Sequence, residues 1–186
     1  MSRDNNPKNR RFRTSPIEES SVFESKYSDS VSGDLAIVKN KKTGERYLVK
    51  EKMFGDVNTF NREVDKAESR LQLAHENLND LADYTTSQKK QLCSTFYLIR
   101  LFSKLPAGIL TTDIQQRQLS NNYYTNDELR IILDDVATGA AYRTNALGPH
   151  GNISPAVIGQ RTNGSFQLVD DMNNLIPTHK ESQKNN

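Results

Sequence analysis

The sequence predicts an α+β fold, with an antiparallel sheet and one helix in its first half and mainly helices in its second half. Two observations support this fold class. Short runs of β-branched and aromatic residues flank turn-forming residues, which is typical of β-hairpins. Two longer segments repeat apolar residues every three or four positions, which is typical of helices with one buried face. These segments lie between polar ends of a chain of 186 residues, which is long enough for one modest domain.

The first periodic segments predict a β-hairpin and then a helix. Residues 35–38 and 47–50 are strand-like, and the loop between them is rich in turn-forming residues. The helix is expected over 59–74, with Asp56 or Asn58 as its N-cap. Its apolar side chains are spaced by three and four residues and therefore share one face: Phe60, Val64, Ala67, Leu71 and Ala74.

Two further strands are expected after this helix. The run over 94–102 is strongly strand-like because it is rich in aromatic and aliphatic residues. Residues 81–86 are a second candidate strand, and the polar residues 87–90 are expected to form the turn between the two. These strands would extend the sheet that the hairpin begins.

The second half of the chain predicts a short helix, a long helix and a last hairpin. The short helix is expected over 109–119, and Thr125 is expected to cap a long helix over 126–144. Residues 157–169 predict a hairpin whose turn contains an Asn-Gly pair. The apolar residues of the long helix share one face, which requires a partner: Leu129, Ile132, Leu133, Val136 and Ala140.

Composition limits the classes of function. Lys and Arg number 25 against 23 Asp and Glu, and the net charge of +2 gives no reason to expect a nucleic-acid partner. Cys93 is the single cysteine, which excludes an intramolecular disulfide and a cysteine-rich metal site. The mean hydropathy is −0.75, and no apolar run approaches the ~20 residues that a membrane span needs. We therefore expect a protein of the cytoplasm or cytoskeleton, with no membrane partner.

The two ends of the chain are predicted to be tails. Residues 1–30 form a basic and polar N-terminal arm, and residues 173–186 form a polar C-terminal tail. Both have too few large apolar groups to offset the entropy cost of ordering, so we expect them to be disordered or ordered by a partner. Arg10, Arg11 and Arg13 concentrate positive charge in the arm and are expected to bind an acidic partner surface.

Local sequences in these segments, taken in order, resemble the first part of a eukaryotic protein kinase domain. Residues 43–50 resemble the family's strand that ends in the nucleotide-contacting lysine, and residues 60–63 resemble its helix that carries the partner glutamate. Residues 75–78 are similar to the family's His-Pro-Asn-Ile segment. Residues 96–102 resemble the strand that enters the hinge, and residues 124–129 resemble the start of the long helix.

The resemblance implies a kinase-like small lobe over 31–104, made of an antiparallel sheet plus one helix. The first part of a helical large lobe would follow over 105–172. Only the tail follows residue 172, so we expect this chain to lack the half of the large lobe that binds a protein substrate.

A vestigial nucleotide site is also implied by the resemblance. Lys50, Glu63 and Asp170 match the lysine, its glutamate partner and the aspartate of the Asp-Phe-Gly motif. The run that follows Glu63 is longer than the family leads us to expect, so Glu68 and Glu51 are alternatives as the partner of Lys50. These groups would bind ATP weakly, and no metal or other cofactor is expected.

The segment over 150–157 resembles the kinase catalytic loop with its active groups replaced. The resemblance places Asn152 where a carboxylate accepts the proton of the substrate hydroxyl. Ser154 stands where a lysine contacts the phosphate, and Val157 stands where an asparagine binds the metal ion. The sequence therefore predicts a degenerate kinase-like domain that is not an enzyme.

Two functions are compatible with these features. The first is a non-catalytic scaffold or structural subunit of a larger assembly, with protein partners such as tubulin or axonemal proteins in a cilium. The alternative is a nucleotide-sensing pseudokinase, which binds ATP without phosphoryl transfer and uses it as a conformational ligand.

Overall fold

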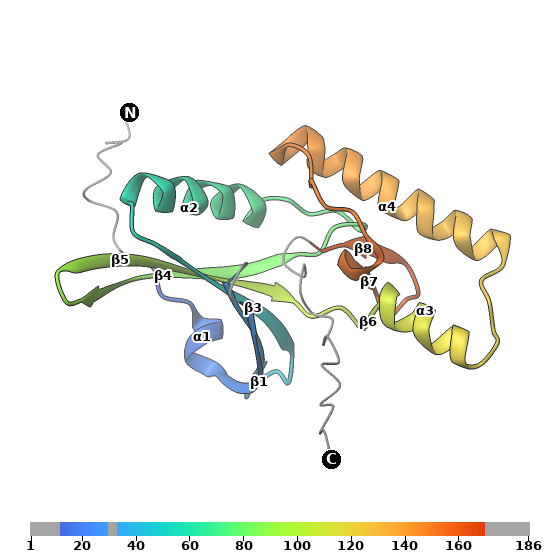
Figure 1. The fold of residues 1–186 in the computed structure, drawn as a ribbon, viewed down its shortest axis with the longest axis horizontal. Helices are drawn as coiled ribbons and strands as arrows, with labels where there is room; N and C mark the ends of the chain where they lie inside the picture. The colour runs from blue at the N-terminus through green and yellow to red at the C-terminus, as the bar shows by residue number, and fades with distance from the viewer. Residues whose placement is uncertain (1–11, 30–32, 170–186) are drawn as a thin grey trace, which may run out of the picture.

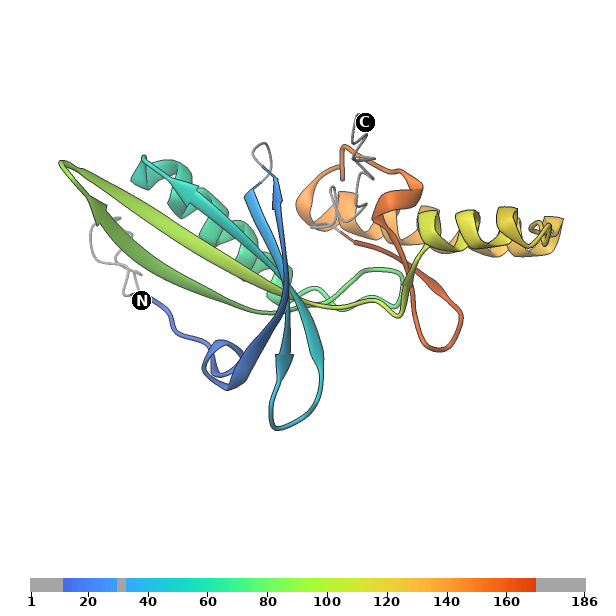
Figure 2. The same cartoon turned by 60° about the horizontal axis from the view of Figure 1, so that its bottom comes forward.

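The fold is mixed α+β, in a computed structural model that describes residues 12–29 and 33–169. A five-stranded antiparallel sheet has the order β1-β2-β3-β5-β4, and a small three-stranded sheet has the order β6-β7-β8. Figures 1 and 2 show the large sheet with α2 as one part of the molecule, and α3, α4 and the small sheet as the other. In chain order the elements are α1 (Pro16–Ser20), β1 (Ser21–Asp29), β2 (Gly33–Asn40), β3 (Arg46–Phe54), α2 (Val57–Leu71), β4 (Leu81–Gln91), β5 (Ser94–Lys104), β6 (Gly108–Ile109), α3 (Leu110–Leu119), α4 (Asn126–Leu147), a 3-10 turn (Pro155–Val157), β7 (Ile158–Gln160) and β8 (Phe166–Leu168).

Most elements that the sequence predicts are present close to their expected bounds. The first hairpin is β2 and β3, with Ile37 opposite Leu48, and the helix predicted over 59–74 is α2, capped by Asp56. The long helix is α4, and Thr125 and Glu128 form a reciprocal capping box at its start. The predicted mixed α+β class with an antiparallel sheet is therefore confirmed.

The predicted turn at 87–90 is wrong, because β4 continues to Gln91 and the turn falls at Leu92 and Cys93. Beyond the other strands, β4 and β5 run on as a two-stranded ribbon with Lys89 opposite Phe96 (Figure 1). Backbone pairing with β5 satisfies the amides of these residues whatever their side chains are. Polarity alone therefore did not mark the end of the strand.

The prediction that residues up to about 30 form a disordered arm is wrong for residues 12–29, which form α1 and β1. The buried carboxylate of Asp83, which is far from this segment in the sequence, holds the segment in place. Ser15 Oγ donates to Asp83 Oδ2 at 2.5 Å and also accepts the amide of Ile17 as the cap of α1. The guanidinium of Arg13 binds Asp83 Oδ1 at 2.6 Å and lies over the ring of Tyr84. Polar side chains thus order a segment that lacks an apolar core of its own.

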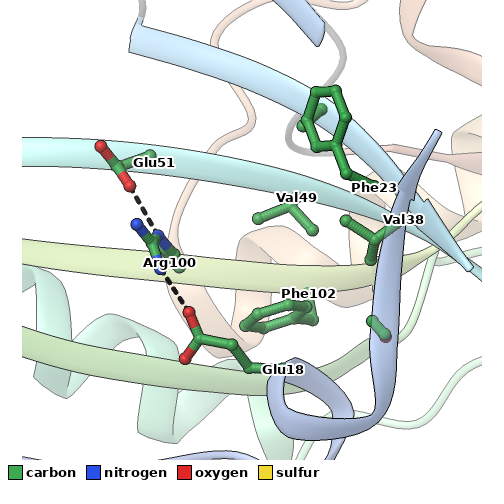
Figure 3. Close-up of a pocket in the computed structure, with 9 residues that line it drawn as sticks. Glu18, Phe23, Val38, Val49, Glu51, Arg100 and Phe102 are labelled. Atoms are coloured by element: carbon green, nitrogen blue, oxygen red, sulfur yellow. Dashed lines mark hydrogen bonds and ion pairs between the residues drawn. The ribbon is translucent and has the colours of Figure 1, made fainter. Parts of the chain in front are cut away.

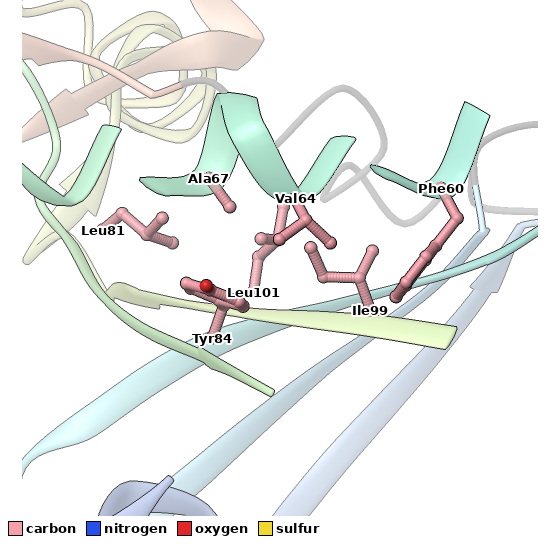
Figure 4. Packing of buried hydrophobic residues seen from close by; sticks show 7 residues of the cluster. All are labelled: Phe60, Val64, Ala67, Leu81, Tyr84, Ile99 and Leu101. Carbon is pink, nitrogen blue, oxygen red and sulfur yellow. The ribbon is translucent and has the colours of Figure 1, made fainter. Parts of the chain in front are cut away.

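The main core lies between α2 and the large sheet, as Figure 4 shows. One face of α2 meets side chains that rise from β4 and β5. Fully burying an aliphatic or aromatic side chain of this kind stabilises a fold by roughly 1.5–3 kcal/mol, as an upper estimate. The cluster consists of Phe60, Val64, Ala67, Leu81, Tyr84, Ile99 and Leu101.

A second core joins α3 and α4 to the small sheet. It consists of Leu110, Ile132, Val136, Ile158 and Phe166. At the other end of α3, Arg117 binds both Asp113 and Glu128 and lies over the ring of Tyr124. Burial of the ring and its hydrogen bond to Asp113 raise the pKa of Tyr124 to about 12. This polar cluster fixes the two helices against each other.

The two parts of the molecule are joined by the segment between α2 and β4. Asn79 N donates to Leu168 O, and Leu168 N donates to Asn77 O, each at 2.9 Å. The buried amide of Asn77 also donates to Phe166 O at 3.0 Å. Gly139 of α4 lies so close that a Cβ atom there would be 2.3 Å from Asn77 O.

Among the described residues, no helix is both long and apolar enough to cross a membrane.

We predict that Gly139→Ala lowers the free energy of unfolding by about 1–2 kcal/mol. The added methyl group must push the backbone at Asn77 away from α4, and this cost exceeds the ~1 kcal/mol that alanine gains over glycine within a helix. Urea unfolding of the full chain, followed by circular dichroism, measures the change.

Gly55→Ala is the matched control, since a Cβ atom at Gly55 meets no atom within 4 Å. Its unfolding free energy should stay within about 0.5 kcal/mol of the wild type. Equal or greater stability of the Gly139→Ala variant would contradict the close approach of α4 to the Asn77 segment.

Candidate functional site

A cleft between the large sheet and the C-terminal end of α4 contains one of the residues that the sequence singled out, Glu63. A pocket of about 270 Å³ opens there. Its lining residues come from β3, β5, α2, α4 and the segment just after α4. Among the described residues, four cationic side chains and one carboxylate line it: Lys52, Lys66, Arg70, Arg143 and Glu63.

Lys50 and Lys52 lie on the face of β3 that carries α2. Lys50 is opposite Leu101 and Lys52 is opposite Ile99, and both of these β5 residues belong to the core under α2. Side chains two residues apart on a strand share a face, so the two lysines point the same way. Lys50 is buried, whereas Lys52 is half-buried.

Among the described residues, the ion pairs of Glu63 are with Lys52 and Lys66. Glu63 Oε2 lies 2.7 Å from Lys52 Nζ, and Oε1 lies 2.7 Å from Lys66 Nζ. Burial alone would raise the pKa of Glu63, but the hydrogen bonds and charges of the two lysines outweigh it and lower the pKa below its usual value. Glu63 is therefore ionised, and its ion pair with Lys52 links α2 to β3.

The resemblance implied Lys50 as the partner of Glu63, and the structure shifts this pairing by two residues. Helix α2 folds back over β3 after a short connection. Which lysine of β3 lies beside Glu63 therefore depends on how far each residue is from that connection. Glu63 lies ~9 Å along α2 from its first residue. Lys52 lies ~7 Å and Lys50 ~13 Å from the end of β3. Lys52 is thus the better match.

The two alternative glutamates have other partners. Glu68 accepts a hydrogen bond from Tyr84 OH at 3.1 Å. Glu51 alternates with Lys50 and Lys52, and it binds Arg100 on the opposite face of the sheet at 2.6 Å. Among the residues that the structure describes, the carboxylate that lines the cleft is therefore that of Glu63.

The loop that resembles a catalytic loop begins where α4 ends. Gly148 stops the helix with φ of 86°, a conformation that glycine adopts readily, and Arg143 Nη1 donates to its carbonyl at 2.5 Å. Asn152 is exposed, and Ser154 is half-buried just before the 3-10 turn.

Val157 is a core residue rather than part of a site. Its exposed fraction is 0%, and it packs against Leu78 and Leu168. Its carbonyl accepts the amide of Val169 at 2.9 Å. The side chain of Val157 therefore packs the loop against β8.

Apolar side chains also fill the space between the large sheet and the connection to the helical part. Leu48 and Val169 are almost completely buried there, beside Ile37. Leu105 and Ile109, at the two ends of the connection, pack against this group. Ile37, Leu105 and Ile109 also line a pocket of about 470 Å³ along the connection.

Several predicted site residues lie outside the described residues, namely Arg10, Arg11 and Asp170. Arg13 is described, and it holds Asp83 within the chain. Within 12–29 and 33–169, no group of three or more His, Cys, Asp or Glu residues is placed to hold a metal ion.

Comparison with known proteins does not assign this site. No protein-family model matches the sequence, and no curated protein matches it.

Sequence reasoning missed all four cations that line the cleft among the described residues. Lys52 could have been found, because it follows Lys50 by one strand repeat, and Lys66 could have been found as an i,i+3 neighbour of Glu63. Arg143 carries no such signal, because only the packing of α4 brings it near α2.

We predict that a double-mutant cycle of Lys52→Met and Glu63→Gln gives a coupling of about 0.5–1 kcal/mol at neutral pH, as expected for a half-exposed pair. The coupling should persist while the pH is above the ordinary glutamate pKa of 4.5, and it should be lost as the pH falls through the lowered pKa of Glu63. Urea unfolding at several pH values measures it.

The matched cycle replaces Lys50 instead, as Lys50→Met with Glu63→Gln. Its coupling should stay within about 0.3 kcal/mol of zero. A larger coupling for Lys50 than for Lys52 would restore the pairing that the sequence implied.

Proposed function

We propose that this chain is a non-catalytic, protein-kinase-like scaffold that serves as a structural subunit of a larger protein assembly. The observation that carries the proposal is the complete burial of Val157, where the resemblance expects a metal-binding amide. Valine offers no oxygen to a metal ion. The exposed Asn152 lacks the carboxylate that would accept a proton, and Ser154 lacks the cation that would contact a phosphate.

The kinase-like part of the proposal is supported by the arrangement around α2. The helix leaves β3, packs on β4 and β5, and carries a glutamate that binds a lysine of β3. The chain then passes from β5 through a short connection into the helical part. This is the order of parts that the sequence resemblance implies.

A nucleotide-sensing pseudokinase is the second candidate, and the cationic cleft favours it. Four cations surround one carboxylate in a pocket of about 270 Å³, which suits the charge of a phosphate chain. A pocket of about 470 Å³ along the connection, lined in part by Ile37, Leu105 and Ile109, has the volume of a small-ligand site and would be the seat for the base. Thermal stabilisation that saturates with ATP and Mg²⁺ would favour this candidate over the first.

The scaffold role predicts that the purified chain does not transfer phosphate from ATP to itself or to generic protein substrates. The general base, the phosphate-contacting cation and a metal ligand are all replaced, and loss of the base alone typically costs ~10²–10⁴ in rate. Transfer of labelled γ-phosphate is the measurement, with Lys50→Ala as the control. Turnover well above that control would refute the non-catalytic proposal.

An exposed apolar stripe on α4 supports the assembly role. The sequence predicted one apolar face, and the structure divides it: Ile132 and Val136 are buried in the core, whereas Leu129 and Leu133 are 44% and 68% exposed. These two leucines are one helical turn apart and adjoin on the surface. We define Leu129 and Leu133 as the α4 stripe, and we propose that a neighbouring subunit covers it.

A cytoskeletal assembly, such as a ciliary doublet microtubule, is the placement we propose. Acidic tubulin surfaces would suit the basic residues Arg10 and Arg11. Because Arg13 is engaged by Asp83, variants that test this contact should change Arg10 and Arg11 and leave Arg13 intact.

We predict that the isolated chain self-associates at high concentration through the α4 stripe. The double variant Leu129→Gln with Leu133→Gln should sediment as a monomer, because glutamine is polar yet keeps the helix. Sedimentation velocity is the measurement. Leu92→Gln with Met53→Gln is the matched control, since both side chains are exposed away from α4, and it should behave as the wild type.

Three results together would defeat the assembly proposal. They are a wild-type chain that stays monomeric, protection of α4 from hydrogen exchange in that monomer, and no pelleting with microtubules at low salt.

A further inference from the structure

A second pocket lies on the face of the large sheet opposite α2. Its volume is about 410 Å³, and residues of α1, β1, β2, β3 and β5 line it (Figure 3). It is separate from the cationic cleft, because Val49 and Glu51 alternate with the lysines of β3 and so point to the other face.

The floor of this pocket is apolar. Val49 and Phe102 are direct cross-strand partners and are both buried. Ala36 is the partner of Val49 on its other side, and Val38 is the partner of Phe23. Phe23 is 61% exposed, although it stands beside apolar neighbours. An aromatic ring that is left in water next to an apolar floor marks a surface that a partner can cover.

The opposite side of the pocket is charged. Arg100 Nε donates to Glu51 Oε2 at 2.6 Å, and its Nη1 donates to Glu18 of α1. Figure 3 shows the three side chains in a row beside the apolar residues. Burial would lower the pKa of Arg100, but the hydrogen bonds and charges of the two glutamates outweigh it and raise the pKa. Among the lining residues that the structure describes, the charged groups are two carboxylates and one guanidinium, which is an excess of one carboxylate.

We propose that this pocket binds an extended segment of a partner protein in which an aromatic side chain is adjacent to an arginine or lysine. The ring would lie on Val49 and Phe102 beside Phe23, and the cation would meet the outer oxygens of Glu18 and Glu51. Charge complementarity selects the cation, and the apolar floor selects the ring. The inference rests on the proposed function, because both treat the chain as a protein-binding module. The pocket lies on the large sheet, however, whereas the α4 stripe lies in the helical part.

Binding by one side-chain anchor is modest in strength. The pocket volume is in the range of small ligand sites, and an aromatic side chain has enough apolar surface to cover its floor. We expect a dissociation constant on the order of 10–100 μM for a short peptide, because ordering the peptide offsets much of the gain.

The probe is a fluorescein-labelled peptide with one Phe-Arg pair among glycines and serines, titrated with the full chain and followed by fluorescence polarisation. Two companion peptides replace the Arg by Glu or the Phe by Ala. The Phe-Arg peptide should bind saturably and each companion about tenfold more weakly. Equal binding of the three peptides, or no saturable binding up to about 1 mM, would overturn the proposal.

Variants of the chain locate the binding. Phe23→Ala should weaken binding of the Phe-Arg peptide about tenfold, and Glu51→Gln about two- to fivefold. Phe12→Ala is the matched control for the first, since Phe12 is 49% exposed and does not line the pocket. Glu19→Gln is the control for the second, because Glu19 is exposed on α1 next to Glu18. Both controls should bind as the wild type.

Two comparisons separate this inference from the assembly proposal. The α4 stripe variant should bind the peptide normally even though it no longer self-associates. If the peptide binding fails and the stripe behaves as proposed, only the present inference is lost. Equal losses in Phe23→Ala and Phe12→Ala, with circular dichroism spectra unchanged, would place binding elsewhere and overturn it.

Discussion

The backbone pairing of the Asn77 segment with β8 is the constraint on which the rest of the structure depends. This segment follows α2 and precedes β4, and its hydrogen bonds to Leu168 tie the large sheet to the helical part. The close approach of Gly139 and the burial of Val157 follow from the same contact. Because the segment is held on both sides, the cleft that α2 and α4 line has a defined width. A change in this pairing would move Arg143 of α4 relative to Glu63 of α2.

The large sheet has two functional faces because side chains alternate along its strands. The face under α2 carries the core together with Lys50 and Lys52, while the other face carries the apolar pocket and the Arg100 ion pairs. In each case, charged groups from separate elements converge on one partner. Glu63 forms ion pairs with two lysines on the first face, and Arg100 forms ion pairs with two glutamates on the second. Such convergence fixes α2 and α1 at their positions on the sheet.

Prediction from the sequence was most successful where the signal was local. The apolar spacing of α2 and the capping box at Thr125 are properties of short stretches of chain, and both appear in the structure. Prediction failed where distant residues decide. Ser15 and Arg13 are ordered by Asp83, which lies 68 residues after Ser15, and no local pattern reports that contact. The candidate site divides in the same way, because Glu63 was named from the sequence, whereas the lysine named as its partner was two residues away from the one it binds.

The sequence by itself determined the fold class, the order of the main strands and helices from β2 onward, and the segments in which Glu63, Val157 and Leu133 lie. Tertiary structure decided which of those residues meet. It paired Glu63 with Lys52, buried Val157 and left Leu133 exposed, because these outcomes depend on how far α2 folds back over β3 and on which face of α4 meets the small sheet. Periodicity gives the direction of a side chain relative to its own element, and packing alone gives the neighbour it reaches.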